Sequence, residues 1–517
     1  MELATQITSS VHKSSIIYQI LGALTSLILF RFILYLRARH KRYQLFKYYG
    51  IPGPEPNLLN GNFDLFSDNN KVLEAYEECH ARYGKTYGIF IADEASIIST
   101  DLEFNRKVFL DNYACFQERL DMLITGPLSK SLLLTSGETW KTVHRILSPS
   151  FSGYKLRESE GLEFLLDTVA RLVDYVEKKF SSSQAGKNTI ELDILALMKA
   201  VALKMISDMA VNLPGVEVKE NEVHVLALDK LFKQGCEEAT PMVIRAPFSR
   251  KLVNFMANNF QFSKTMELIN SCISTAIDAR LSELRANRWR KSHSDIVGHL
   301  SYAHLKGIIT RDEVIENCNA LLVAGYDTTS TTLTYVFWCL AKYPQVQEKL
   351  RQELKIYGSE SEYLEQVLNE VMRLYPTVIS FVSRKASTTI EIDGITIAQG
   401  TRVIYNPWLV HRDPTIWQNP LEFNPDRFNE SLVRDLHPCA FAPFGLGARK
   451  CIGYRLASLE MKIVVSDLIL RYRFGLIAPQ DLKLKQYGLF LTKPVNTVLL
   501  ELTKLNDEVG RAQNLLI

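Results

Sequence analysis

The chain has 517 residues, of which 47% are hydrophobic and 23% are charged. This composition is ordinary for a folded protein and excludes a collagen-like chain or long disordered tracts. The 60 lysines and arginines and 57 acidic residues give a formal charge of +3, which is too close to neutral to indicate nucleic acid as a partner. The 8 cysteines form no CxxC pair, so they indicate a reducing compartment with mostly free thiols.

The N-terminal region contains a segment that is long and apolar enough to cross a membrane. Residues 16–36 read IIYQILGALTSLILFRFILYL, and at about 1.5 Å per residue they reach about 30 Å, the thickness of the hydrocarbon core. Lysines and arginines follow this segment and Lys13 alone precedes it, so the positive-inside rule places the rest of the chain in the cytosol. A cleaved signal peptide is the alternative, but its basic residues would precede the apolar core.

The expected organisation has four parts. A short lumenal N-terminus spans 1–15, a transmembrane signal anchor 16–36, a basic and proline-rich hinge 37–56, and a single folded domain 57–517. The prolines of the sequence IPGPEP at 51–56 cannot continue a helix, and they predict a stiff extended elbow.

The body is expected to be mainly α-helical with small β-sheets. Hydrophobic periodicity and turn residues divide it into helical and extended stretches. The expected helical stretches are 69–83 and 139–350, and the expected strands are 86–90, 96–100 and a group over 388–405 with Asp393-Gly394 as its turn.

The longest predicted helix runs from about 310 to 342. Thr310 and Glu313 form a capping box at its start. Its interior contains the polar run Asp327-Thr-Thr-Ser-Thr-Thr332. Serine and threonine are mediocre helix formers, and a buried aspartate is costly without a partner. This local conflict therefore indicates a functional site.

A cysteine follows a glycine-rich loop near the C-terminus. Cys451 lies just before a predicted helix over 454–472, where the helix dipole and unpaired amides stabilise a thiolate. Gly453 lacks a Cβ and would let a flat ligand approach the helix start. Arg449 could pair with an acidic group on such a ligand. A single cysteine in such a loop is by itself a weak indication of cofactor binding.

Four motifs in order make the chain resemble the cytochrome P-450 family over essentially its whole length. Its haem-binding signature is matched by Phe444, Gly447, Arg449, Cys451 and Gly453. Its oxygen-activation motif on the central helix is similar to Ala324-Gly325-Tyr326-Asp327-Thr328-Thr329. Its Glu-x-x-Arg motif, and the segment that adds a third charge to form a structural triad, are similar to Glu370, Arg373 and Arg427. The stretches 50–54 and 140–151 look like the animal drug- and steroid-oxidising branch, which also contains thromboxane synthase.

The resemblance implies a microsomal haem-thiolate monooxygenase, which inserts one oxygen atom of O2 into a lipophilic small molecule. The Cys451 thiolate would be the iron ligand of haem b. Asp327 and Thr328 would deliver protons on the opposite, distal face of the haem. The alternative for the Thr328 hydroxyl is a bond to the Ala324 carbonyl of its own helix. Ala324 and Gly325 would give the haem and O2 room against the helix.

The implied contacts to the haem propionates are Trp140, His144, Arg384 and Arg449. The family usually has Trp-x-x-x-Arg where this chain has Trp140 and His144. His144 shares a helix face with Trp140, whereas Arg145 is rotated away by about 100°. His144 is therefore expected to make the contact, as a hydrogen-bond donor.

The resemblance also implies the partners and the location. Electrons would come from NADPH through NADPH–cytochrome P-450 reductase, with cytochrome b5 as a further donor, since no GxGxxG fingerprint follows a strand. The chain would be a single-pass protein of the endoplasmic reticulum membrane with its catalytic domain in the cytosol. Five basic residues form either a face that steers an acidic partner or an ordinary solvated helix face: Lys141, Arg145, Lys450, Arg455 and Lys462.

By family position, an apolar pocket for a lipophilic substrate is expected. Its expected walls are 116–132, the helix before Gly325, 377–382 and 489–490. Residues 241–256 mix apolar and basic side chains, so they either contact the membrane near a substrate entrance or pack on the body.

Two other function classes remain open on this fold. A haem-thiolate isomerase needs no oxygen activation, and a non-catalytic haem sensor or carrier could retain Cys451 alone. Neither needs the Asp327 and Thr328 pair, so its presence favours the monooxygenase.

Overall fold

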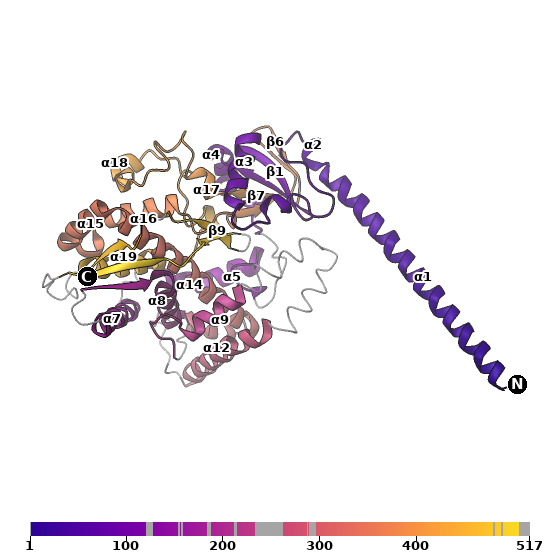
Figure 1. Cartoon of the computed structure of the whole chain (residues 1–517), viewed down its shortest axis with the longest axis horizontal. Coiled ribbons are helices and arrows are strands. Elements are labelled where there is room, and N and C mark those ends of the chain that lie inside the picture. The colour runs from indigo at the N-terminus through magenta and orange to yellow at the C-terminus, as the bar shows by residue number, and fades with distance from the viewer. Residues whose placement is uncertain are drawn as a thin grey trace.

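The computed structural model describes residues 2–119, 128–153, 156, 159–183, 188–210, 215–232, 262–286, 288, 296–478, 481–487 and 490–505. A long N-terminal helix projects from a mainly helical body (Figure 1), and the expected fold class of helices with small sheets is confirmed. The helices are α1 Glu2–Tyr43, α2 Leu45–Tyr48, α3 Val72–Tyr83, α4 Leu102–Arg106, α5 Gly137–Leu147, α7 Ser159–Ser182, α8 Ile194–Ala210, α9 Val223–Phe232, α12 Phe262–Arg285, α13 Ile296–Leu305, α14 Arg311–Lys342, α15 Pro344–Tyr357, α16 Glu362–Leu374, α17 Pro407–Val410, α18 Glu430–Val433 and α19 Tyr454–Arg471.

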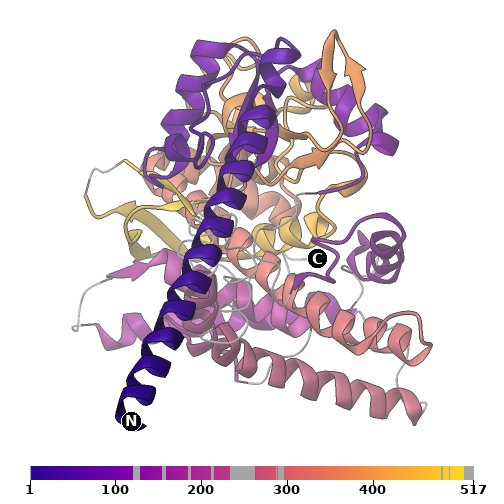
Figure 2. The ribbon, with the colours of Figure 1, turned by 90° about the vertical axis from the view of Figure 1, so that its right-hand side faces the viewer.

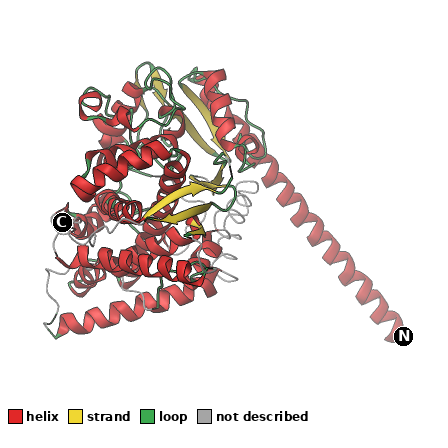
Figure 3. Ribbon diagram, turned by 60° about the vertical axis from the view of Figure 1, so that its left-hand side comes forward, coloured by secondary structure: helices red, strands yellow, loops and turns green. Residues whose placement is uncertain are grey.

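Short strands form small sheets beside the helices (Figure 3). The strands are β1 Thr86–Ile91, β2 Glu94–Ser99, β3 Thr189–Asp193, β4 Ser383–Lys385, β5 Ile390–Ile392, β6 Ile395–Ile397, β7 Arg402–Tyr405, β8 Tyr472–Leu476, β9 Leu484–Tyr487, β10 Leu491–Pro494 and β11 Leu499–Lys504. One sheet has the order β1-β2-β7-β4, in which β2 and β7 are parallel. The others are β3-β11-β8, β10-β9 and β5-β6.

The β5–β6 hairpin confirms the predicted turn, because Asp393 and Gly394 have φ values of 51° and 76°. The prediction that 139–350 is helical missed β3. That strand pairs with β11 at the other end of the chain. Its alternation of polar and apolar residues, TIELD, was a local sign of a strand that the prediction passed over.

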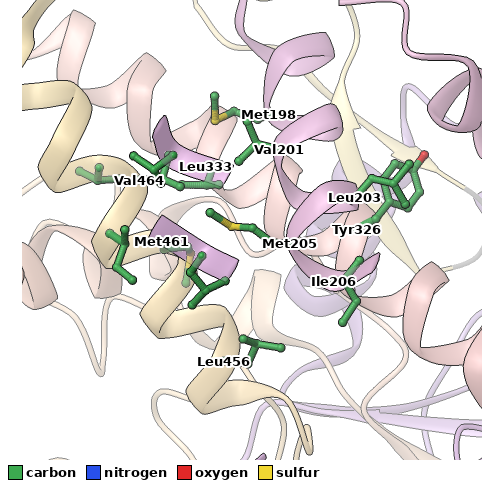
Figure 4. Close-up of a cluster of buried hydrophobic side chains, with 14 of the residues drawn as sticks. Met198, Val201, Leu203, Met205, Ile206, Tyr326, Leu333, Leu456, Met461 and Val464 are labelled. Atoms are coloured by element: carbon green, nitrogen blue, oxygen red, sulfur yellow. The ribbon is translucent and has the colours of Figure 1, made fainter. Parts of the chain in front are cut away.

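The core is built around α14, which begins with the predicted capping box. The Glu313 amide donates to Thr310 Oγ1 at 3.2 Å, and the Thr310 amide donates to Glu313 Oε2 at 2.6 Å. Figure 4 shows Met205 of α8, Leu333 of α14 and Met461 of α19 in one apolar cluster. Full burial of each such side chain stabilises the fold by roughly 1.5–3 kcal/mol. This packing fixes α14 between α8 and α19.

The N-terminal helix α1 is long and apolar enough to cross a membrane. Its most apolar window has a mean hydropathy of 1.8, and none of that window is buried in the body. The helix extends beyond the apolar segment to Tyr43, so residues 37–43 of the predicted hinge are helical. Figure 1 shows it leaving the body as a straight rod, and in Figure 2 it crosses in front of the body.

The end of α1 nearest the body is fixed to the β1–β2 hairpin. Arg39 Nε lies 2.8 Å from Asp93 Oδ1, and the Arg39 side chain is only 2% exposed. The Tyr35 hydroxyl donates to Asp93 Oδ2 at 3.1 Å, and the Tyr43 hydroxyl donates to the Ala92 carbonyl at 2.9 Å. The anchor therefore joins the body through a largely buried ion pair, with the proline-rich segment following it.

Replacing Asp93 tests this attachment. Asp93→Ala leaves the Arg39 charge buried without its carboxylate, which should cost about 1–3 kcal/mol of stability. The double variant Arg39→Met/Asp93→Ala should recover most of the loss. Thermal unfolding measures both effects.

Asp174→Ala is the control, because its ion pair with Lys178 is exposed and should contribute less than about 1 kcal/mol. Equal melting temperatures for Asp93→Ala and the parent would contradict a fixed anchor.

Candidate active site

A cavity lies between α14 and the loop that precedes α19. Ala324 and Thr328 of α14 line it, as do Phe444 and Cys451 of the loop. Residues that were more than a hundred positions apart in the sequence therefore meet in one site, as the motifs predict.

The loop bends sharply so that Cys451 reaches the cavity. The Cys451 amide donates to the Phe444 carbonyl at 2.9 Å, and the Lys450 amide donates to the Gly447 carbonyl at 3.0 Å. Gly447 has φ +66°, and a Cβ there would lie 2.2 Å from the Phe109 carbonyl oxygen. Only glycine meets both constraints at this position.

The Cys451 thiol is enclosed by protein but open toward the cavity that it lines. Burial raises the pKa of this thiol, while the Gly453 amide and the charges of Arg119 and Lys450 lower it. A coordinated metal ion deprotonates a thiol outright. Gly453 itself caps α19 beside Phe151 and does not belong to the cavity lining.

Three arginines line the cavity: Arg384 and Arg449, which are buried, and Arg119, which is partly buried. Each donates to a backbone carbonyl: Arg119 to that of Arg449 at 2.6 Å, Arg384 to that of Leu446 at 3.0 Å, and Arg449 to that of Thr135 at 2.7 Å. Arg119 Nε, Arg384 Nε, Arg449 Nε and Arg449 Nη1 are buried without a hydrogen-bond partner in the part of the chain that the structure describes.

Electrostatics make this arginine cluster a site for an acidic ligand. Burial and the neighbouring cations lower the pKa of Arg384 and of Arg449 to about 9, and burial lowers the pKa of Arg119 to about 10. Buried charges are costly unless they are paired. A ligand with two carboxylates would satisfy the unpartnered nitrogens, and haem b carries two propionates. The residues present therefore fit haem b, with Cys451 as the iron ligand.

Arg119 was not among the residues selected from the sequence. It belongs to the 116–132 segment expected to border the pocket, where it is the only arginine. The sequence therefore indicated Arg119 only through its position in a segment expected to border the pocket. The structure adds that its guanidinium reaches the same cavity as the other two.

Trp140 and His144 of α5 also line this cavity. Their rings lie 4.7 Å apart, which confirms the predicted shared helix face, and the Arg449 guanidinium lies 4.6 Å from the Trp140 ring. Burial and the Arg449 charge lower the pKa of His144, and its Nδ1 lies 3.1 Å from the Ser148 hydroxyl. A neutral His144 is therefore a hydrogen-bonding group here, where an arginine would add a fourth cation.

The residues of the motif on α14 face in different directions. Ala324 and Thr328 line the cavity, and the Thr328 hydroxyl donates to the Ala324 carbonyl at 2.7 Å. Gly325 instead faces α8, where a Cβ would lie 2.7 Å from a side-chain carbon of Ile206. Asp327 is buried outside the cavity lining.

The three residues of the expected triad are in contact. Arg373 Nε and Nη2 donate to the two Glu370 oxygens at 2.7 and 2.9 Å, and Arg427 Nε donates to Glu370 Oε1 at 3.0 Å. The side chains of Glu370 and Arg373 are fully buried. Arg373 Nη1 also donates to the His411 carbonyl at 2.7 Å. The triad therefore ties α16 to the segment that begins after α17.

His411 connects the triad to the cysteine loop. Its Nε2 accepts from the Ala442 amide at 3.2 Å, and its ring lies 5.3 Å from that of Phe441. Burial, with the charges of Arg373 and Arg412, lowers the pKa of His411 to about 3. A neutral imidazole can accept the amide hydrogen, so His411 is held in the form that the loop requires.

The remaining lining is mostly apolar. Leu132 and the end of α14 before Gly325 contribute to it as expected. From the expected segment 377–382, the lining residues are Thr377, Val378, Phe381 and Val382. Phe116 is buried and is not part of the lining, while Phe490 packs on Phe381 with ring centroids 5.4 Å apart. Residues 241–256 and Leu489 lie outside the described residues.

Comparison with known proteins agrees with this geometry. A family model described as cytochrome P-450 matches residues 51–500. The chain is similar to cytochrome P-450 3A41 of Mus musculus, with 27% identity covering 93% of this chain and 96% of that protein. It is also similar to cytochrome P-450 3A16 of Mus musculus, 28% identical over the same shares of both chains, and to 3A9 of Rattus norvegicus, 26% identical over 93% and 96%.

The assignment of Cys451 is tested by its removal. In the reduced protein with carbon monoxide, a thiolate-ligated haem gives a strongly red-shifted Soret band. Cys451→Ala should abolish that band, because no other described cysteine lines the cavity. Cys439→Ala is the control, since that thiol is buried outside the lining and should leave the band intact. An unchanged spectrum in Cys451→Ala would exclude this cysteine as the ligand.

His411 should contribute a pH dependence to stability. Its folded pKa of about 3 lies below the ordinary value of 6.5, so the unfolded chain binds the extra proton between these values. Stability is therefore fully present above pH 6.5 and falls by up to about 1.4 kcal/mol per pH unit below it. Equilibrium unfolding at several pH values should show a shallower slope in His411→Gln, which keeps an acceptor for Ala442. Parallel curves would show that His411 titrates normally.

Proposed function

Since this chain belongs to the cytochrome P-450 family, we propose that it is a membrane-anchored monooxygenase of lipophilic molecules that receives electrons from NADPH through a separate reductase. The family expected from the four motifs is confirmed over residues 51–500. The chain is accordingly an oxidoreductase that uses haem b, O2, a lipophilic substrate and a redox partner. The finer assignment names NADPH–cytochrome P-450 reductase as that partner and cytochrome b5 as a second donor.

One observation carries this proposal: Cys451 and Thr328 line the same cavity, with three incompletely partnered arginines beside them. When bound, the haem supplies the activation of O2, and a cysteine thiolate ligand favours O–O cleavage over reversible oxygen binding. An isomerase or a haem carrier would need the cysteine and the arginines but not a hydroxyl group in the cavity.

Thr328 has the role of handling protons at the cavity wall. Its hydrogen is engaged with the Ala324 carbonyl, so its oxygen lone pairs remain to accept a hydrogen bond from a water in the cavity. That water is the group that passes protons onward, and Asp327, one residue earlier, is the acid that replenishes them. Proton transfer of this kind contributes about 10²–10⁴-fold to a reaction rate.

The substrate class follows from the cavity wall. Apart from the cluster of Arg119, Arg384 and Arg449, the cavity lining consists mostly of aliphatic and aromatic side chains, which suit a lipophilic molecule. These are Leu132, Leu133, Ala320, Leu321, Val378 and Phe381. Asn317 is polar but already bonded, since its side chain accepts from the Leu132 amide at 2.7 Å and donates to the Glu313 carbonyl at 2.7 Å.

The docking face for the reductase lies beside the cysteine loop. The Lys450 ammonium and the Arg455 guanidinium lie 4.3 and 4.9 Å from the ring centroid of Tyr454, the first residue of α19. Arg145 is exposed on α5. Lys141 and Lys462 are each paired with a glutamate, so they add less positive potential. An exposed cationic face steers an acidic partner at low ionic strength.

Membrane anchoring is proposed from α1. Its apolar part can cross a bilayer once, and the lysines and arginines that follow it favour the cytosol. The endoplasmic reticulum is the proposed membrane, with 1–15 in the lumen and the catalytic domain, 57–517, in the cytosol.

Thr328→Ala tests the proposed reaction. The variant keeps good helix propensity, so folding and haem content should match those of the parent. With the reductase and a substrate, NADPH should still be consumed, but hydrogen peroxide should rise and product per NADPH should fall severalfold. Product, peroxide and NADPH are measured together.

Thr334→Ala is the matched control. Thr334 makes the same bond to a carbonyl four residues earlier, at 2.8 Å, but does not line the cavity. Thr334→Ala should form as much product per NADPH consumed as the parent does. Parent-like coupling in Thr328→Ala would mean that the hydroxyl only bonds its own helix, and would favour the isomerase or the carrier. An absence of NADPH consumption in the parent would argue against a monooxygenase supplied by this reductase.

A further inference from the structure

Three threonine hydroxyls lie on the cavity wall formed by α14 and the segment that follows α16. Thr328 and Thr332 are one helical turn apart on α14, and Thr377 comes shortly after the end of α16. All three line the cavity, as do the apolar residues Pro376 and Val378 on either side of Thr377. The hydroxyls are therefore isolated polar groups in a mostly apolar wall.

The hydrogens of all three hydroxyls are directed to the protein. Thr328 donates to the Ala324 carbonyl at 2.7 Å, and Thr332 donates to the Thr328 carbonyl at 2.9 Å. The hydroxyl oxygens of Thr332 and Thr377 lie 2.9 Å apart. Because a hydroxyl has only one hydrogen, and that of Thr332 is engaged with the carbonyl, Thr377 is the donor in this pair.

Thr377 is consequently a hydrogen-bond acceptor toward the cavity. Its oxygen keeps two lone pairs, and no group in the described part of the chain donates to them. The Thr377 side chain is partly exposed, whereas Thr332 is only 7% exposed. Thr377 is thus the member of the pair that a ligand can reach.

The backbone holds Thr377 in place as well. The Thr492 amide of β10 donates to the Thr377 carbonyl at 2.8 Å, and the Thr492 hydroxyl donates to the Pro376 carbonyl at 2.9 Å. The bond to Thr332 orients the side chain from the other side. A group that is already fixed loses little conformational entropy when a ligand binds, so this oxygen can orient a ligand.

The strong donors of the cavity belong to a different set of residues. Arg119, Arg384 and Arg449 carry N–H groups and no acceptor, and the proposed function assigns them to the haem propionates. A ligand group beside Thr377 therefore meets an acceptor. An alcohol can donate to it, whereas a ketone or ether oxygen would bring two acceptors together.

We propose that Thr377 determines specificity by accepting a hydrogen bond from a hydroxyl group of the lipophilic substrate, and that Thr332 keeps Thr377 in its acceptor form. This inference rests on the proposed function and names the substrate class of that site. Thr332 lies about 6 Å along the helix from Thr328. The substrate is therefore a lipophilic alcohol whose hydroxyl is held about one helical turn from the Thr328 position.

The experiment uses ligands with one end fixed at the haem of the full-length, haem-loaded protein. In a series of 1-alkylimidazoles of increasing chain length, the imidazole nitrogen binds the iron and the chain extends into the cavity. At each length the chain ends in an ethyl, a hydroxymethyl or a methoxy group, which have equal numbers of heavy atoms. The shift of the haem spectrum gives each Kd.

In the parent, the affinity of the hydroxymethyl ligand relative to the ethyl ligand should peak at one chain length. The peak should exceed neighbouring lengths by about 2–10-fold, the value of one net hydrogen bond. The methoxy ligand should show no peak, because it cannot donate. Thr377→Val should remove the hydroxymethyl peak, and Thr377→Ser should retain it.

Thr332→Val separates this role from a merely structural one. The variant leaves the Thr377 hydrogen without its acceptor, so Thr377 could donate to a ligand as well as accept. The methoxy ligand should then gain a peak that the parent lacks. Thr334→Val is the matched control, because Thr334 bonds the Ser330 carbonyl at 2.8 Å outside the cavity lining. It should leave all peaks as in the parent.

A parent without a hydroxymethyl peak, or a peak that survives in Thr377→Val, would overturn the role of Thr377 while leaving the proposed function intact. If Thr377→Val loses haem, Thr332→Val decides: a new methoxy peak supports the inference, and its absence overturns it. Failure of every ligand to shift the haem spectrum of the parent would instead overturn the proposed site.

Discussion

The structure depends on a group of positive charges that the described chain leaves without an acidic partner. Arg119, Arg384 and Arg449 line one cavity, and four of their nitrogens lack a hydrogen-bond partner there. Burying such charges is costly unless an anion accompanies them. Each guanidinium donates through Nη2 to a backbone carbonyl, which holds it in place before any ligand enters. An acidic cofactor therefore contributes to the stability of this part of the fold as well as to its chemistry.

Around this arginine cluster, buried hydrogen bonds hold the chain in place more than long helices or strands do. Glu370 and Arg373 fix the segment that contains His411, and His411 accepts from the loop that carries Cys451. Glu370 and Arg373 are thus far from Cys451 in the sequence, but only two contacts separate them from the loop that carries it. Breaking one member would leave a buried charge unpaired, which is far more costly than the small net stability of the intact pair.

The central helix α14 separates two environments that share one turn. Toward the cavity it presents Ala324 and Thr328, and toward α8 it presents Gly325, which allows close packing on Ile206. Asp327 is directed to Lys493 instead. A helix turns by about 100° per residue, so consecutive residues of one motif necessarily face different partners. Short motifs of this kind therefore combine packing and chemistry.

The sequence by itself determined the family, the fold class, the cysteine loop, the capping box of α14 and the apolar anchor. These features depend on local residue order: positive φ values at glycine, the spacing of polar residues, and an apolar run of sufficient length. Tertiary structure alone decided which side chains meet. Arg119 joins the cavity through a loop, Lys493 reaches Asp327 from a C-terminal strand, and Arg39 attaches the anchor to Asp93. Such contacts join residues far apart in the chain, and no local pattern encodes a partner whose position is set by the packing of the whole body.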